Sequence, residues 1–320
     1  MRVFALAFLA AKLWGKPVIS LNQSFVVNHA ADLAVAVNVF NAFSLNSFRE
    51  KKSWAVANEN GLHSSVLCPD FAFLDATEKA GKGPAGLEGG YFCVTGSAAL
   101  ENYALNDYAK TIEVLSKKTG LQPLCLYSRK SDRKLVEAIC EKLGTGNLTV
   151  ISQKDYKSHA EILPVLAHAA FTIGGRYHTS ISALSMKTPV VLSAGNSHKN
   201  EGLGDMLGMS LPVFRSDDVD GILQQVMSYL ENKAKVTEML EAGLQDIQTQ
   251  QKEFALQLSR MLFKTLAGNQ EEPDERNLLQ APFPVVRSQI SKGSRHSNIR
   301  SQIDINANLA RYEWNELSNR

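Results

Sequence analysis

An arginine and a histidine lie between a short apolar run and a helix-like stretch in the second half of the chain. The run Ala169–Ile173 predicts a strand, two glycines interrupt it, and Thr179–Met186 has small and apolar residues at helical spacing. Arg176 and His178 are therefore expected at a helix N-terminus, at the carboxyl edge of a parallel sheet. Free backbone N–H groups and the positive end of the helix dipole favour a phosphate or a carboxylate there.

The spacing of this pair suits one shared ligand. Side chains two residues apart at a helix start can both point at one anion, and Gly174 and Gly175 leave room for it beside the backbone. The other interpretation is that Arg176 caps a neighbouring carbonyl group and His178 packs against the sheet. A helix N-terminus disfavours the charged form of a histidine, so an acid role for His178 requires a bound anion that restores its proton.

A further cation follows the next apolar run. The loop from Ser193 to Gly202 leaves the same edge of the same predicted sheet, so Lys199 is a candidate for a second contact to the anion. The alternative is a lysine that is simply solvated. His198, the preceding residue, is expected to be exposed.

Polar side chains also follow the strands predicted elsewhere in the chain. Arg49 comes directly after a short strand, and Ser53 lies one turn into the following helix. Arg49 is a candidate to reach the same anion across a cleft, although an Arg-Glu-Lys-Lys segment is also typical of a solvated helix start. Gln23 and Ser24 follow the first strand, and Ser97 lies in the turn that opens the second half. These are substrate-binding candidates, with ordinary loop polarity as the alternative.

Several classes of protein are disfavoured by composition. The chain has 320 residues, 44% hydrophobic and 21% charged, with a formal charge of +2 and no dominant basic stripe, so a nucleic-acid partner is not expected. No apolar run is long enough to cross a membrane. Cationic and bulky residues after Ala11 favour an N-terminal helix over a signal peptide. No nucleotide-binding glycine motif, metal-ligand spacing or catalytic triad is present, so neither a metal nor a resident cofactor is expected.

The four cysteines are widely spaced, and none belongs to a metal-binding or redox motif. Cys68, Cys93 and Cys125 fall in or beside apolar strand-like runs, and Cys140 lies on an apolar helix face. Buried free thiols are the expected outcome. This favours a reducing compartment, and we expect a cytoplasmic protein. The sequence carries no signal of oligomeric state.

Apolar runs alternate with helix-like stretches along the chain, which predicts an α/β fold built from two Rossmann-like domains. The expected strands are 17–21, 44–48, 65–67, 91–95, 123–127, 148–151 and 169–173, followed by another after Pro189. The expected organisation is a partial N-terminal domain at 1–77, a glycine-rich linker at 78–90, a second domain with the Arg/His site and a helical end at 91–267, and a loosely packed or disordered polar tail at 268–320. The first domain is expected to be incomplete, because roughly three strands precede the linker where a mean sheet holds about five or six. Either upstream sequence or the tail would complete it.

Six short motifs in order resemble the polysaccharide pyruvyl transferase family. They are Gly15-Lys-Pro-Val18, Arg49-Glu-Lys-Lys-Ser53, Pro69-Asp70, Gly174-Gly-Arg-Tyr-His178, Thr188-Pro-Val190 and Lys199, and together they span roughly Trp14 to Gly208. The Gly-x-Arg-x-His motif is the most specific of the six. The chain departs from the family in lacking its N-terminal strand and Gly-Asp turn, which makes it look truncated at the N-terminus.

The resemblance implies two Rossmann-like domains in a glycosyltransferase-B-like arrangement. It also implies transfer of a pyruvyl group from phosphoenolpyruvate to a pair of hydroxyl groups on a glycan or polysaccharide precursor, which forms a ketal. Arg49, Arg176 and His178 would then be catalytic, with Lys199 as a further contact to the donor. Phosphoenolpyruvate would be a substrate, and the partners would be this donor and a glycan acceptor.

Two other functions stay open at the level of sequence. A nucleotide-sugar-dependent glycosyltransferase of the same fold commonly carries a glutamate on the helix after the glycine-rich turn, and Thr179–Leu184 has none. A non-catalytic anion- or glycan-binding remnant is compatible with the short first domain.

Overall fold

The computed structural model describes residues 2–27, 29–77, 81–87, 90–97, 105–127, 132–156, 158–195 and 197–267. The predicted tail at 268–320 and parts of the predicted linker at 78–90 lie outside the described residues. The chain divides into two compact units, residues 1–248 and 249–320. In the second unit the described residues continue helix α10 (Lys233–Ala267), which begins in the first. Both sheets belong to the first unit.

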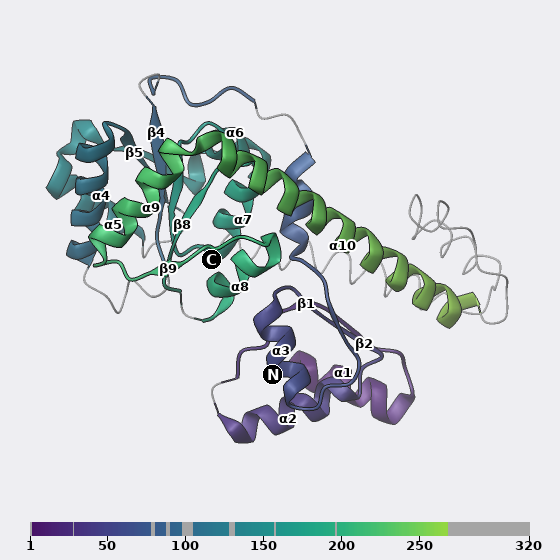
Figure 1. The fold of residues 1–320 in the computed structure, drawn as a ribbon. Coiled ribbons are helices and arrows are strands. Elements are labelled where there is room, and N and C mark those ends of the chain that lie inside the picture. The colour runs from purple at the N-terminus through teal and green to yellow at the C-terminus, as the bar shows by residue number, and fades with distance from the viewer. Residues whose placement is uncertain are drawn as a thin grey trace. The chain divides into compact units, whose positions relative to one another are not determined.

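A small parallel sheet is formed by the N-terminal third of this unit (Figure 1). Its strand order is β1-β2-β3, and its helices are α1, α2 and α3. The bounds are α1 (Arg2–Trp14), β1 (Ile19–Gln23), α2 (Ala30–Asn41), β2 (Leu45–Phe48), α3 (Lys51–Glu59) and β3 (Ser65–Leu67), followed by the 3-10 helix η1 (Phe71–Thr77). The chain thus enters each strand from the same end, and the segments after the strands collect at one carboxyl edge.

Phenylalanines fill the core of this small sheet. Phe25, Phe40 and Phe48 are almost fully buried and meet one another edge to face or tilted, with ring centroids 5.8 to 6.3 Å apart. Phe4 of α1 joins them at 5.4 Å from Phe40. Such aromatic pairs add to the free energy gained by burying their area. The packing holds β2 in place, and the residue that follows Phe48 is Arg49.

A larger parallel sheet of six strands follows, in the order β6-β5-β4-β7-β8-β9. The bounds are β4 (Tyr91–Thr95), β5 (Gln122–Tyr127), β6 (Thr149–Ser152), β7 (Thr172–Gly174), β8 (Val190–Ser193) and β9 (Val213–Phe214). The chain runs outward from β4 to β6, returns to the other side of β4 at β7, and then runs outward again. The topological switch point therefore lies between β4 and β7, where doubly wound sheets bind their ligands at the carboxyl edge.

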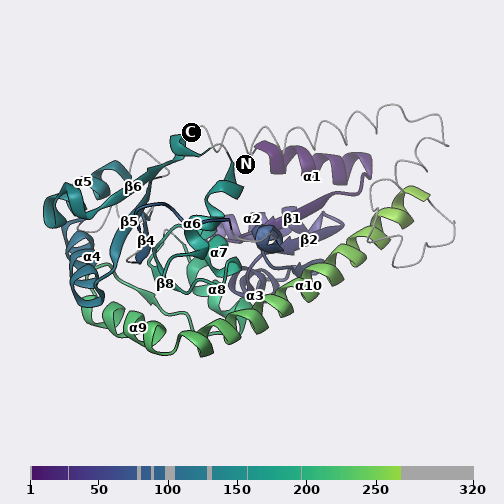
Figure 2. The same cartoon turned by 90° about the horizontal axis from the view of Figure 1, so that it is seen from above.

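Helices cover both faces of the large sheet. Cys93 points into a core shared with α6 (Leu163–Ala167), α7 (Tyr177–Ser185), α8 (Lys199–Leu207) and the start of α10. Its neighbours Phe92 and Val94 point into a second core, with α4 (Leu105–Thr119), α5 (Asp132–Leu143) and α9 (Val219–Glu231). Figure 2 shows α4 and α5 on one side of β4 and β5, with α6 and α7 on the other. The apolar runs seen in the sequence are strands buried on both faces.

The order of elements matches the prediction, and most boundaries agree within two residues. Two differences are local. The strand predicted at 169–173 begins only at Thr172, and the helix after it begins at Tyr177, before the expected Thr179. A two-residue strand, β9, also pairs with β8 in a region expected to be mostly helical. Two residues are too few to show any hydrophobic periodicity.

Candidate active site

Arg49 stands at the carboxyl edge of the small sheet, held by residues that follow the other two strands. Its Nη1 donates to Asp70 Oδ2 at 3.0 Å, and its Nε donates to Ser24 Oγ at 2.7 Å. The side chain of Arg49 is 16% exposed and that of Asp70 only 5%. A partly buried, charge-assisted pair of this kind fixes the guanidinium group in one orientation. Arg49 is thus a preorganised cation rather than a solvated helix-start residue.

His178 of α7 meets this group from the large sheet. Its Nε2 lies 3.4 Å from Arg49 Nη1 and 3.7 Å from Asp70 Oδ2. The carboxyl edges of the two parallel sheets therefore come together at these three side chains. The His178 side chain is 59% exposed, so a ligand can reach it. The sequence interpretation of His178 as packed against the sheet does not describe this position.

Tyr177 completes the surroundings of Arg49. The guanidinium carbon lies 5.1 Å from the centroid of the Tyr177 ring, within the range of a cation–π interaction. Burial raises the pKa of the Tyr177 hydroxyl well above its ordinary value, so the phenol stays protonated. Neither Tyr177 nor Asp70 was predicted as a site residue. The only signal in the sequence was their place in two motifs, Tyr177 next to His178 and Asp70 next to Pro69.

The site disfavours the charged form of His178. Desolvation is the largest cause that lowers the pKa of this imidazole, and the positive charges of Arg49 and Lys199 act in the same direction. The carboxylate of Asp70 opposes them and raises the pKa. These neighbours together favour the neutral imidazole, and an anion that binds beside it would favour its protonation.

Lys199 is the first residue of α8, at the carboxyl edge of β8. Desolvation lowers the pKa of its amine, and the charge of Arg49 lowers it further, while Glu50 and Asp70 raise it. Lys199 thus shares an electrostatic environment with Arg49 and His178. Its contact to an anion stays a prediction.

Arg176 is the N-cap residue of α7, and it is anchored differently from Arg49. Its Nη2 donates to Asp132 Oδ1 at 2.5 Å, and the two side chains are 14% and 4% exposed. Asp132 is the first residue of α5, so this ion pair joins the turns that follow β5 and β7. The carboxylate partner of Arg176 could not be predicted from the sequence, because no local pattern around Arg176 indicates a residue 44 positions away.

Gly174, the last residue of β7, and Gly175 after it serve close packing at the switch point. Gly174 has φ of 149°, and a Cβ there would overlap Thr95 Oγ1 and the Thr95 carbonyl group. A Cβ on Gly175 would overlap the side chain of Ser97. Ser97 in turn donates to the Ala194 carbonyl group at 2.7 Å, which ties the turn after β4 to the turn after β8. Direct contact of these residues with a substrate stays a prediction.

Ser53 and Gln23 are both engaged within the protein. Ser53 is fully buried, and its hydroxyl accepts from the Phe25 N–H at 2.7 Å and contacts Glu50. Gln23 donates from Nε2 to the Leu21 carbonyl group at 2.9 Å. Contact of Ser53 or Gln23 with a substrate stays a prediction. The structure brings together Arg49, Ser24 and His178 among the predicted residues, and Lys199 is close enough to lower the pKa of His178.

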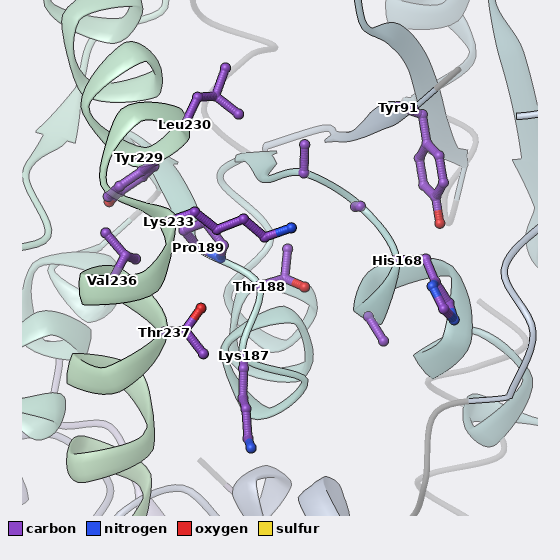
Figure 3. Close-up of a pocket in the computed structure, with 14 residues that line it drawn as sticks. Tyr91, His168, Lys187, Thr188, Pro189, Tyr229, Leu230, Lys233, Val236 and Thr237 are labelled. Atoms are coloured by element: carbon purple, nitrogen blue, oxygen red, sulfur yellow. The ribbon is translucent and has the colours of Figure 1, made fainter. Parts of the chain in front are cut away.

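A separate cavity lies at the opposite edge of the large sheet. Its volume is about 340 Å³, and its lining includes Tyr91 at the start of β4, Pro189 just before β8, and Tyr229 and Lys233 at the junction of α9 and α10 (Figure 3). These are the amino ends of the strands. None of the predicted site residues is among those that line it. Because doubly wound sheets bind substrates at the carboxyl edge, we place the chemistry there and not in this cavity.

Three further features bear on the function of the part of the chain that the structure describes: cysteine thiols, groups of metal-binding side chains and membrane-spanning helices. Cys68, Cys93 and Cys125 are buried free thiols and Cys140 is half-buried, and burial raises the pKa of Cys68 to about 12. In the described ranges, no group of three or more histidine, cysteine, aspartate or glutamate side chains could hold a metal ion. None of the helices described is both long and apolar enough to cross a bilayer.

The sequence matches the family model described as polysaccharide pyruvyl transferase over residues 3–197. The chain belongs to this family. The matched region contains Arg49, Asp70, Arg176 and His178 but ends before Lys199. A search of curated proteins found no match.

Solved structures share the fold at low sequence identity. MnaA of S. aureus, solved with UDP, superposes with a TM-score of 0.58 at 15% identity, covering 83% of this chain and 74% of its own. The UDP-forming alpha,alpha-trehalose-phosphate synthase of Burkholderia vietnamiensis gives 0.56 at 12% identity, covering 84% and 73%. Anabaena Alr3699/HepE, in complex with UDP-glucose, gives 0.57 at 12% identity, covering 81% and 76%. The fold class is therefore as predicted: α/β, with two Rossmann-like sheets in a glycosyltransferase-B-like arrangement and a helical C-terminal region.

Proposed function

We propose that this chain transfers a pyruvyl group from phosphoenolpyruvate to two hydroxyl groups of a sugar and forms a ketal. The observation that carries the proposal is the group formed by Arg49, Asp70 and His178 at the meeting carboxyl edges of the two sheets. Membership of the polysaccharide pyruvyl transferase family supports it. The donor, the ketal product and the glycan acceptor are parts of this proposal.

The charges in the site suit a donor that carries both a phosphate and a carboxylate. Arg49 presents a fixed guanidinium group, Lys199 adds a point charge, and Arg176 stands at the switch point. Guanidinium groups bind carboxylates and phosphates through two parallel hydrogen bonds, whereas an ammonium group is less directional. We assign the donor's two anionic groups to these cations.

His178 is placed to move a proton. In the first step a sugar hydroxyl oxygen bonds to the central carbon of phosphoenolpyruvate and loses its proton, and the methylene carbon gains a proton to become a methyl group. In the second step another hydroxyl displaces phosphate from the same carbon and loses its proton. The neutral imidazole can accept the hydroxyl proton, and once the donor anion has raised its pKa it can deliver one.

Calorimetric titration with phosphoenolpyruvate tests the donor, with UDP-glucose as the comparator. The described neighbours solved with UDP or UDP-glucose make a nucleotide sugar the strongest rival, although α7 has no acidic residue in its first turn. Binding of phosphoenolpyruvate alone supports the proposal. Binding of UDP-glucose alone would replace it with a glycosyltransferase, and no binding of either would favour a non-catalytic remnant.

Substitution of Arg49 is the sharper test of the site. Arg49→Lys keeps the charge but loses the two-pronged geometry, so affinity for phosphoenolpyruvate should fall at least about tenfold, as expected for a lost charge-assisted hydrogen bond. Arg176→Ala should abolish binding. The matched control is Arg215→Lys, because Arg215 forms a two-pronged pair with Asp217 at the exposed surface. Unchanged affinity in Arg49→Lys would remove Arg49 from the site.

A further inference from the structure

Beneath the site, a buried glutamate organises the start of α3. Glu50 is the N-cap residue of this helix and is 0% exposed. Its Oε2 accepts from the Ser53 N–H at 2.8 Å, and its Oε1 contacts the Ser53 hydroxyl. A carboxylate at an N-cap is favourable, but the complete burial of one costs free energy unless all its oxygens are satisfied. The arrangement therefore needs a further donor nearby.

His198 supplies a donor from the large sheet. Its Nε2 lies 3.1 Å from Ser53 Oγ and 3.6 Å from Glu50 Oε1, and its side chain is only 19% exposed. A serine hydroxyl has one proton to donate and two lone pairs to accept. Because the proton faces Glu50 and one lone pair accepts from the Phe25 N–H, the remaining lone pair accepts from His198. Nε2 of His198 therefore carries a hydrogen, and the Ser53 hydroxyl has partners in His198, Glu50 and the Phe25 N–H.

Helix α8 packs directly on this glutamate. A Cβ on Gly202 would lie 3.0 Å from Glu50 Oε2 and 3.1 Å from Glu50 Cβ, so a larger residue would require Glu50 or the helix to shift. The close approach and the hydrogen bond of His198 act on the same turn of α8. Lys199 is the first residue of that turn.

We propose that Glu50, Ser53 and His198 form a latch between α3 and α8 that sets the distance between Arg49 and Lys199. Arg49 is the residue before Glu50, and Lys199 is the residue after His198, so each end of the latch is covalently next to one cation. The role of the latch in donor binding rests on the proposed function. None of the three latch residues has to touch the donor, and they are positioning residues.

Amide hydrogen exchange tests the latch without any ligand. His198→Leu removes the donor and should speed exchange in residues 199–204 at least about tenfold, while exchange in β4 and β5 stays unchanged. His198→Gln restores an N–H donor and should restore protection. His63→Leu, at an exposed histidine, is the control. Unchanged exchange at the start of α8 in His198→Leu would overturn the latch. If that variant does not fold, Glu50→Gln gives the same test.

A double-mutant cycle tests whether the latch acts through Lys199. His198→Leu should weaken phosphoenolpyruvate binding about tenfold in the wild-type background and leave it unchanged in a Lys199→Met background. Equal losses in both backgrounds would overturn the positioning role. If the wild-type protein binds no phosphoenolpyruvate but His198→Leu still speeds exchange at α8, the proposed function fails and the latch stands.

Discussion

The candidate site combines a fixed cation with a neutral base at contact distance. Arg49 is held on two sides, by Asp70 and Ser24, and His178 lies against it through Nε2. A neutral imidazole can approach a guanidinium group this closely, whereas an imidazolium would be repelled unless a carboxylate or a bound anion compensated it. The chemistry of His178 is therefore set by its charged neighbours.

The pKa of His178 should respond to those neighbours in opposite directions. Lys199→Met removes a positive charge that disfavours the imidazolium, so the pKa should rise, and Asp70→Asn removes the charge that favours it, so the pKa should fall. In the wild-type protein the pKa should lie below the ordinary 6.5, so the ring stays neutral as pH falls to about 6.5 and gains its proton only below that. NMR titration of the His178 ring protons measures this pKa in the wild-type protein and in both variants.

A wild-type titration at or above 6.5, or a fall on Lys199→Met, would contradict this account. Lys187→Met provides the control, because Lys187 pairs with Glu241 and is not among the charges that act on His178.

How far the site could be predicted depended on the kind of signal each residue carries. Arg49 follows β2 directly, and His178 lies in the first turn of the helix after β7. In a parallel fold these positions alone place a residue at the ligand edge. Asp70 and Asp132 could not be found in this way, because a carboxylate is common in any loop and its partner is distant in sequence. His198 was expected to be exposed, and the structure shows it mostly buried against Ser53 and Glu50.

At the scale of elements, the carboxyl ends of β4 and β7 fit together only because Gly174 lacks a side chain. Gly174→Ala would force a Cβ against Thr95 at a φ of 149°, which L residues rarely adopt. Overpacking of this kind costs about 1–3 kcal/mol in the free energy of unfolding. The urea midpoint should fall accordingly. Gly146→Ala, with nothing within 4 Å of its Cβ, is the control and should leave the midpoint nearly unchanged.

If Gly174→Ala unfolds at the wild-type urea concentration, the strand ends are not packed as described. The glycine residue type predicted a close approach at Gly174 and Gly175, and the structure shows Thr95 close to Gly174 and Ser97 close to Gly175. Room for a ligand beside these glycines stays a prediction.

Elements were predicted more reliably than contacts. The strand Tyr91–Thr95 has bounds identical to those predicted, because it is a continuous run of buried residues bounded by glycines. The start of β7 and the strand β9 depend on pairing with neighbouring strands, which no local pattern contains.

At the scale of the first unit, the two sheets have unequal cores. The small sheet buries a single cluster around its phenylalanines, whereas the large sheet buries one cluster on each face. Resistance to local opening grows with buried apolar contact. We therefore expect amide exchange in β1, β2 and β3 to be faster than in β4, β5 and β8.

Hydrogen exchange read by mass spectrometry on the unliganded protein measures this difference. Equal protection in the two sheets would mean that they open as one cooperative unit. Phosphoenolpyruvate should reduce the difference in exchange rate between the two sheets, since its proposed contacts come from residues of both sheets.

Each arginine of the candidate site forms an ion pair with a carboxylate of the protein, Arg49 with Asp70 and Arg176 with Asp132. An incoming anion must therefore compete with a counter-ion that the protein already supplies. Chloride and other small monoanions form fewer directed hydrogen bonds with a guanidinium group than a carboxylate with two oxygens does. Such ions therefore displace the internal carboxylates poorly. Only a ligand with several negative charges at a suitable separation can bind the arginines more strongly than Asp70 and Asp132 do. For the proposed donor, this pairing would lower the affinity somewhat and in return favour a ligand with several charges over small monoanions.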